Sequence, residues 1–289
     1  EIRDVEVSGA FKGITAYQMW NQGSILQLMN CEFHDCEVGL QVHTRGVNMI
    51  SCDFQNNTIG YQQDAASVLS RVQMCSFENN EQGIEFKSTG GDLYFHASES
   101  DFNVYGLRFS GPGSLYSKCS STSNNSEAGI VVAFGARLML NDALYSAGSQ
   151  HVSVGNKYSV AALFPRLIDL YFGKNDLVPN QLNANRDIYG YMALPGTTSA
   201  TLKALRNHWN TTGSATGIAP SYNTDYLVAN LNNGQLYPVY FDDTNPAAAP
   251  SCAYSNTGLP GSTLRSCGEC GTITTKSFVD IPLDSAMRK

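Results

Sequence analysis

The chain of 289 residues carries eight cysteines, and their spacing bears on metal binding, disulfide formation and core packing. Four of them form a series with an interval of about 22 residues, in which an alanine takes one place: Cys31, Cys52, Cys75, Ala97 and Cys119. Alanine can replace a thiol in a packed interior but not in a metal site, so the series indicates an interior column of small side chains. We predict that these four cysteines are free, buried thiols. Cys36 lies outside the series, and we expect it to pack at a bend.

Three more cysteines lie near the C-terminus, and two of them form the motif Cys267-Gly-Glu-Cys270. Only Cys252 and His208 could complete a zinc site, and the chain has no second CxxC pair, so we predict no metal site. A redox role is disfavoured because no βαβ pattern surrounds the motif. In an oxidising compartment we expect a disulfide among Cys252, Cys267 and Cys270; the alternative is that they stay reduced.

A series of polar residues is the candidate binding site. Its members alternate with apolar positions and recur at similar intervals: Gln41, Gln62, Glu85 and Arg108. A second series flanks it two residues later: His43, Asp64, Lys87 and Ser110. On the outside of a sheet, such a ladder could hold a polar chain such as a glycan along the molecular axis. The alternative is an ordinary solvated face on which Glu85, Lys87 and Arg108 form ion pairs of small energy.

A second polar group surrounds the cysteine series. It consists of Glu32, His34, Asp35, Asp53 and Glu78. These side chains could bind Ca²⁺ or act as acid and base. Because no third orienting group accompanies them, we expect a structural role. The chain has no nucleophile elbow, phosphate-binding glycine loop or HExxH motif, so the sequence identifies no catalytic residue and we expect no cofactor.

A repeat of whole structural units must position these residues. A glycine followed by a large apolar residue recurs at spacings of 21, 23, 23 and 23, as Gly39-Leu40, Gly60-Tyr61, Gly83-Ile84, Gly106-Leu107 and Gly129-Ile130. Other positions keep the same phase: Phe33, Phe54 and Phe77; the pairs Asn56-Asn57, Asn79-Asn80 and Asn124-Asn125; and, three residues before each member of the cysteine series, Leu28, Met49, Val72, Tyr94 and Tyr116.

A unit of about 22 residues has room for three short strands and three bends, but is too short for a βαβ crossover. We therefore predict an all-β fold, a right-handed parallel β-helix in which equivalent residues of successive coils stack about 4.8 Å apart. We expect the recurring glycines to adopt positive φ at a bend, and the asparagines to form ladders that satisfy the turn backbone.

The regular winding weakens toward the C-terminus. Later segments keep the spacing of strands without the glycine: 138–140, 151–154, 167–172, 202–205 and 207–210. We assign residues 1–220 to the β-helix, and residues 221–289 to a loop-rich cap or a connector to a further domain. The first residues do not read as a signal peptide, and we expect the chain to be part of a larger polypeptide.

The composition of the chain disfavours some classes of partner. Charged residues make up 15% of the chain and the net charge is −7, which disfavours nucleic acid and anionic membrane surfaces as partners. No apolar stretch approaches the roughly 20 residues of a membrane span.

Residues 1 to about 210 resemble the right-handed parallel β-helix repeat proteins, the superfold shared by pectate lyases, polygalacturonases, alginate epimerases, phage tailspikes and many bacterial surface proteins. The element Asn207-His208-Trp209-Asn210 and the ending at residues 281–287 resemble multidomain surface proteins exported by the type IX secretion system. The resemblance implies an extracellular or cell-surface location in a bacterium. It supplies no active site, because no cluster of Asp with Lys or Arg matches those of the enzymes.

Our leading hypothesis is a secreted module without catalytic activity that has a structural, adhesive or glycan-contacting role. Its partners would be polysaccharide or proteins of a cell-surface or secretion complex. The alternatives are a polysaccharide lyase, hydrolase or epimerase, and a subunit or cargo of a bacterial secretion complex.

Overall fold

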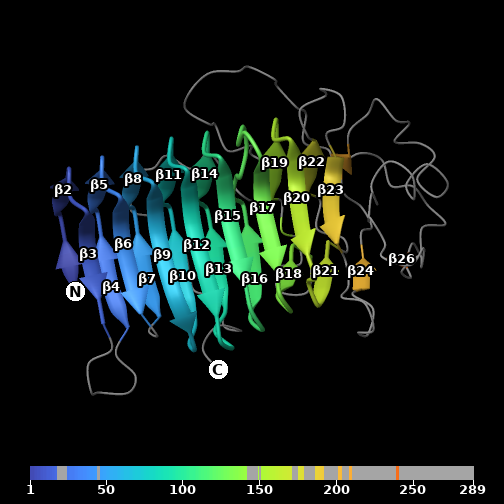
Figure 1. The fold of residues 1–289 in the computed structure, drawn as a ribbon, viewed down its shortest axis with the longest axis horizontal. Coiled ribbons are helices and arrows are strands. Elements are labelled where there is room, and N and C mark those ends of the chain that lie inside the picture. Colours follow the sequence, from blue (N-terminus) through green and yellow to red (C-terminus); the bar gives the residue numbers. More distant parts are fainter. Residues whose placement is uncertain are drawn as a thin grey trace.

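The computed structural model describes residues 1–17, 25–43, 46–141, 149, 151–170 and 175–178, and the backbone of strands at 186–191, 201–203, 208–209 and 239–240. Every regular element in these ranges is a β-strand, and every pairing between strands is parallel. Figure 1 shows the strands stacked side by side along one axis. The chain therefore forms a parallel β-helix, as predicted.

Three walls run along the axis. Sheet A contains β1 (Ile2–Arg3), β4 (Leu26–Met29), β7 (Val47–Ile50), β10 (Ser70–Gln73), β13 (Leu93–His96), β16 (Ser114–Lys118), β18 (Arg137–Met139), β21 (Leu167–Asp169), β24 (Thr201–Lys203) and β26 (Val239–Tyr240). Sheet B contains β2 (Glu6–Ser8), β5 (Glu32–His34), β8 (Asp53–Gln55), β11 (Ser76–Glu78) and β14 (Glu99–Asp101), and continues as β19 (Val152–Val154), β22 (Asp176–Val178) and β25 (His208–Trp209). Sheet C contains β3 (Lys12–Ala16), β6 (Val38–His43), β9 (Ile59–Ala66), β12 (Gln82–Ser88), β15 (Tyr105–Ser110), β17 (Ala128–Ala133), β20 (Tyr158–Leu163) and β23 (Arg186–Tyr191).

The register follows the sequence period. In sheet C, Ile84 pairs with Tyr61 of the coil before and with Leu107 of the coil after. The two parts of sheet B are joined through Ser121, which bridges Glu99 and Val152. Strand β26 falls in the region where we expected a loop-rich cap; the rest of residues 221–289 lies outside the described residues.

The recurring glycines do not serve the purpose that we predicted from the sequence. None of those that open the strands of sheet C has a positive φ; the left-handed positions at the bends between walls are held mainly by other residues. Between sheets A and B these are Asp4, Asn30, Ser51, Met74, Ala97 and Cys119, and between sheets B and C they include Asp35, Asn56, Asn79, Phe102 and Asn124. Each such conformation costs about 1–2 kcal/mol. Cross-coil hydrogen bonds, such as Asn30 N–H to Ile50 O at 3.1 Å, offset that cost.

Crowding explains the glycine column instead. A Cβ on Gly60 would lie 2.7 Å from the carbonyl oxygen of Gly83 and 3.0 Å from a ring carbon of Phe77. Gly39, Gly83 and Gly106 likewise lie against the carbonyl oxygen of the glycine in the next coil, whereas a Cβ on Gly129 would meet Ser153 Oγ and Thr122 O. The column is therefore a site of close backbone approach, which is a common reason for glycine inside a strand.

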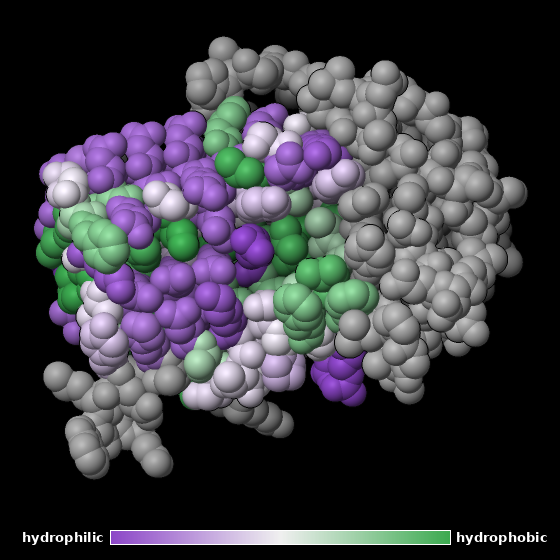
Figure 2. All heavy atoms as spheres, in the orientation of Figure 1, coloured by the Kyte–Doolittle hydropathy of each residue, from purple (hydrophilic) through white to green (hydrophobic). Residues whose placement is uncertain are grey.

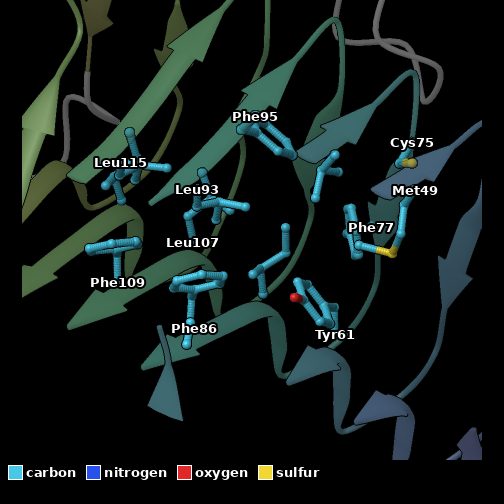
Figure 3. Packing of buried hydrophobic residues seen from close by; sticks show 14 of the residues in the cluster. Met49, Tyr61, Cys75, Phe77, Phe86, Leu93, Phe95, Leu107, Phe109 and Leu115 are labelled. Atoms are coloured by element: carbon cyan, nitrogen blue, oxygen red, sulfur yellow. The ribbon is translucent and has the colours of Figure 1, made fainter. Parts of the chain in front are cut away.

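The interior is filled by stacked side chains, and Figure 3 shows their packing. The phenylalanine series is confirmed: the ring centroids of Phe33 and Phe54 lie 4.8 Å apart, and those of Phe54 and Phe77 lie 4.7 Å apart. Each such aromatic pair adds roughly 0.5–1.5 kcal/mol beyond the area that it buries.

Two of the predicted columns are wrong in the fourth and fifth coils, by one residue. The column of Leu28, Met49 and Val72 continues as Phe95 and Ser117, whereas Tyr94 and Tyr116 lie on the outer face of sheet A. The column of Cys31, Cys52 and Cys75 continues through Ser98 and Ser120, since Cys75 N–H donates to Ser98 Oγ and Ser98 N–H donates to Ser120 Oγ. Ala97 and Cys119 precede those serines at the left-handed bend.

The asparagine ladder is confirmed, with one refinement. Its rungs are the second residues of the pairs and their equivalents: Asn57, Asn80, Asn103, Asn125 and Asn156. The Oδ1 atom of each later rung accepts the backbone N–H of the rung before it, at 2.8–2.9 Å. All five are at least 97% buried. Cys36 begins the ladder, since its N–H donates to Asn57 Oδ1 at 2.9 Å.

Figure 2 shows that hydrophilic residues cover most of the described part of the face turned to the viewer, with hydrophobic residues in smaller patches. Among the described residues there is no helix of the length and apolarity needed to cross a bilayer.

Candidate functional site

The structure places the four predicted binding residues in one row on the outer face of sheet C. Gln41, Gln62, Glu85 and Arg108 are successive partners in the parallel register of β6, β9, β12 and β15. Gln41 Nε2 donates to Gln62 Oε1 at 2.9 Å, and Gln62 Nε2 donates to Glu85 Oε2 at 2.8 Å. The first three members therefore form a continuous chain of hydrogen bonds along the axis.

The flanking series joins this chain from the side. Lys87 Nζ lies 3.3 Å from Glu85 Oε2 and 3.6 Å from Asp64 Oδ1. Asp64 Oδ2 also accepts from Gln41 Nε2 at 3.0 Å and lies 3.4 Å from His43 Nδ1. The register of β9 and β12, in which Phe86 pairs with Gln63, places Asp64 beside Lys87; the irregularity in β9 follows at Ala65, which has a positive φ. The carboxylates of Asp64 and Glu85 are thus shared among amides and an ammonium group.

Arg108 does not form the ion pair with Glu85 that we considered. Its guanidinium donates to Gln82 Oε1 at 3.1 Å and lies 5.2 Å from the ring centroid of Tyr105, a cation–π distance. At the other end of the strip, the rings of Tyr17 and His43 stack at 4.6 Å with an angle of 3° between their planes.

We name these residues the sheet C strip: Gln41, Gln62, Glu85, Arg108, Asp64 and Lys87. Gln41 is only 7% exposed, and the Glu85 side chain is 16% exposed. Because each carboxylate already accepts from a neighbour, neither is poised to take a proton from a substrate. The strip can offer hydroxyl-binding amides at its surface, and its role in binding stays a prediction.

The second polar group lies on the outer face of sheet B, where it does not form one cluster. His34 lies between Asp35 (Nδ1 to Oδ2, 2.8 Å) and Glu6 (Nε2 to Oε1, 2.9 Å). Hydrogen bonds that the imidazole donates to Asp35 and then to Glu6 raise the pKa of His34. Glu32 pairs in register with Asp53, whereas Glu78 lies one coil further along, beside Asp101. Among the described residues, no group of three His, Cys, Asp or Glu side chains could hold a metal ion.

Asp101 is the most unusual carboxyl group on this face, and sequence reasoning missed it. Its side chain is fully buried; Ser121 Oγ donates to it at 2.9 and 3.0 Å, and Ser123 N–H at 2.6 Å. Burial, reinforced by the charges of Glu99 and Glu78, raises its pKa to about 8. A period of 23 residues from Glu78 would have located Asp101; the interval of 22 that we used from Cys75 to Ala97 shifted the register by one.

A buried histidine occupies the interior of the later coils and was also missed. His151 lies between two hydroxyl groups, with Nδ1 2.8 Å from Ser117 Oγ and Nε2 2.9 Å from Thr122 Oγ1. Burial lowers its pKa to about 3, so it is neutral at pH 7. Because both ring nitrogens are engaged and the residue is fully buried, it serves packing rather than chemistry.

The cysteines follow the packing prediction with one exception. Cys31, Cys36, Cys52 and Cys75 are free and buried, and burial raises the pKa of the Cys31 and Cys75 thiols. Cys119 is disulfide-bonded, so our prediction of a free thiol there is wrong. Unlike Cys31, Cys52 and Cys75, which lie in the interior column, Cys119 lies at the left-handed bend between sheets A and B. The predicted disulfide among Cys252, Cys267 and Cys270 lies outside the described residues.

No protein-family model, no curated protein and no solved structure matches this chain.

Proposed function

We propose that the chain is an extracellular, non-catalytic β-helix module of a bacterial cell surface, a rod that spaces or displays other domains and contacts glycan. The observation that carries this proposal is the network of hydrogen bonds and ion pairs within the sheet C strip: the carboxylates of Asp64 and Glu85 already have partners, and Gln41 Oε1 is buried without one among the described residues. Gln62 and Lys87 already bind the Glu85 carboxylate, and Gln41 and Lys87 already bind the Asp64 carboxylate. These acids reinforce neighbouring coils, in the manner of cross-strand pairs.

The winding itself supports a rod. Parallel pairing and the buried asparagine ladder link each coil to the next, so length can be added without a new core. A rod of this kind places attached domains at a fixed separation.

The proposal is tested by assaying the purified chain against a panel of polysaccharides for new reducing ends and for unsaturated products. We expect neither. Cleavage that is abolished in both Glu85→Ala and Arg108→Ala, while the folded structure is retained, would replace the structural role with a polysaccharide lyase or hydrolase.

One observation favours the enzymatic alternative. Asp101 is a carboxyl group with a raised pKa beside two further acids, a combination that often marks a general acid. Its full burial argues against this, since a substrate atom cannot reach it in this conformation. If the panel did reveal cleavage, loss of activity in Asp101→Asn with Glu85→Ala unaffected would assign the chemistry to sheet B.

Export, including export by the type IX system, is part of the proposal. Antibody labelling of intact cells of the native bacterium should detect the protein at the surface. Protein confined to the cytoplasm would contradict the assignment. Co-purification with secretion machinery would favour the alternative of a subunit or cargo of a secretion complex.

A further inference from the structure

The eight cysteines divide into two sets of four. The first set consists of the thiols that the structure shows as free: Cys31, Cys36, Cys52 and Cys75. The second set is Cys119, Cys252, Cys267 and Cys270. Cys119 is disulfide-bonded, and the other three lie outside the described residues. Because a disulfide needs a second cysteine and the first set is free, the partner of Cys119 belongs to the three cysteines near the C-terminus.

Cys119 lies on the outer side of the helix wall. It follows β16 at the bend between sheets A and B, in the position that Asp4 and Asn30 hold in the first coils. Those two residues are exposed, and Asn30 Nδ2 donates to Asp4 Oδ1 at 3.1 Å. The residue after each bend position turns inward, as fully buried Cys31 does after Asn30. A disulfide at Cys119 can therefore join the helix to chain outside the winding without disturbing the interior.

The free cysteines are poor candidates for exchange with this bond. Cys31, Cys52 and Cys75 stack in the interior column, and none is more than 1% exposed. Burial raises the pKa of the Cys31 and Cys75 thiols, so little of the thiolate that attacks a disulfide is present. The position of each cysteine in the wall thus separates those that stay reduced from the one that is oxidised.

We propose that Cys119 forms a disulfide with one of Cys252, Cys267 and Cys270, and that the two cysteines left over pair with each other. Each bond forms by exchange with the disulfide of a thiol–disulfide oxidoreductase: two thiols of this chain lose two protons and two electrons, and the oxidant is reduced to two thiols. Such exchange requires an oxidising compartment. The inference goes beyond the proposed function, because it concerns the covalent linkage of the chain and does not depend on what the helix contacts.

The test is peptide mapping of the full chain, secreted into a bacterial periplasm and alkylated without reduction. Trypsin separates the relevant cysteines, because Cys119 falls in peptide 119–137, Cys252 in 207–265, and both Cys267 and Cys270 in 266–276. If Cys119 is bonded to Cys252, we expect peptides 119–137 and 207–265 to be cross-linked and peptide 266–276 to be lighter by two hydrogens. If Cys119 is bonded to Cys267 or Cys270, all three peptides should be linked together. Peptide 119–137 that is alkylated, or joined to any other peptide, overturns the proposal.

Counting thiols in denaturant without a reductant gives an independent check. The wild type should show the four thiols that the structure describes as free. Cys119→Ser should show one more than the wild type, because its former partner is left unpaired, and the matched control Cys75→Ala should show one fewer. A Cys119→Ser count below that of the wild type overturns the bond at Cys119, and two additional thiols in the wild type overturn the second pairing. An unlinked Cys119 in protein that antibodies detect at the cell surface defeats this inference and leaves the proposed function standing.

Discussion

The interior of the helix differs between its first and its later coils, although the backbone winds through both in the same way. In the first coils, the column of side chains beside sheet B consists of the stacked rings of Phe33, Phe54 and Phe77, and we call these the apolar coils. The same column continues in the following coils as Ser100, Thr122 and Ser153, and we call these the polar coils. The winding therefore does not depend on a particular filling. Two features are common to the apolar coils and the first polar coils: the asparagine ladder, and the glycine column, which ends at Gly129 because Ser159 takes the equivalent place in β20.

The change of filling is compensated within the coil. Where Ser100 replaces a phenylalanine in sheet B, Phe95 replaces the smaller Val72 in sheet A. Its ring is tilted 46° to that of Phe77, with centroids 6.5 Å apart. One coil later, Ser117 and Thr122 leave room for the imidazole of His151. The larger side chain in sheet A thus makes up part of the volume that sheet B loses, while the polarity of the interior rises.

The largest expected effect tests whether the glycine column matters equally in both regions. Gly60→Ala in the apolar coils and Gly129→Ala in the polar coils should each destabilise the fold by roughly 4 kcal/mol, because the new Cβ meets backbone oxygens. Denaturant unfolding measures both. Gly135→Asn is the control; it has open space and a φ of +84° that asparagine tolerates, so a small change is expected. A mild effect of Gly129→Ala alone would show that the polar coils are loosely stacked.

The asparagine ladder should give the next largest effect. Asn80→Ala leaves the backbone N–H of Asn57 and the carbonyl of Phe54 without partners; Asn125→Ala does the same to Asn103 N–H and Ser100 O. Each buried unsatisfied group costs about 1–3 kcal/mol, so we expect losses of roughly 2–3 kcal/mol in both variants. Equal losses would show that the ladder stabilises the apolar and the polar coils alike. A negligible loss in one variant would confine the stabilising role of the ladder to the other region.

Lowering the pH should destabilise the later coils, because His151 is buried there in its neutral form. His151 is neutral in the folded state with a pKa of about 3, whereas the unfolded chain binds a proton at its histidines below about pH 6.5. Stability should therefore fall as pH decreases from 6.5 toward 3, by about 2 kcal/mol at pH 5. Burial also lowers the pKa of His96, to about 4, which acts in the same direction. Unfolding curves at pH 7 and pH 5 for the wild type and His151→Gln measure the effect. An acid response unchanged by the substitution would contradict the assignment.

Asp101 should give a smaller effect of opposite sign. Its pKa of about 8 lies above that of the unfolded chain, so the folded state holds the proton that the unfolded state loses between pH 4 and pH 8. This group therefore lowers stability as pH rises, by about 1 kcal/mol from pH 6 to pH 7. Asp101→Asn should remove that slope. An unchanged slope would mean that another group carries it.

Much of the fold followed from the sequence, because the same residue types recur wherever coils stack like on like. Phe33, Phe54 and Phe77 fixed the register of the apolar coils correctly. The prediction slipped after Cys75, where both the cysteine and the phenylalanine series end and only an alanine remained to follow. The true equivalents, Ser98 and Ser100, are polar residues that a search for a core does not select.

The candidate site was less predictable than the fold. The row of Gln41, Gln62, Glu85 and Arg108 could be located because alternation along a strand fixes which residues face outward. The hydrogen bonds within this row could not be predicted from the sequence, since they depend on side-chain conformations. The position of Tyr94 was also missed: we placed it in phase with Leu28, Met49 and Val72, although it lies on the outer face beside Arg71.

Residue-resolved hydrogen exchange of the ladder amides tests the central claim most directly. The backbone N–H groups of Asn57 and Asn80 lie in the apolar coils and those of Asn103 and Asn125 in or beside the polar coils, and each donates to the next rung. If the ladder stabilises the apolar and the polar coils equally, all four amides should be strongly protected from exchange, with opening free energies within about 1 kcal/mol of one another. Strong protection of Asn57 and Asn80, with rapid exchange at Asn103 and Asn125, would contradict the account.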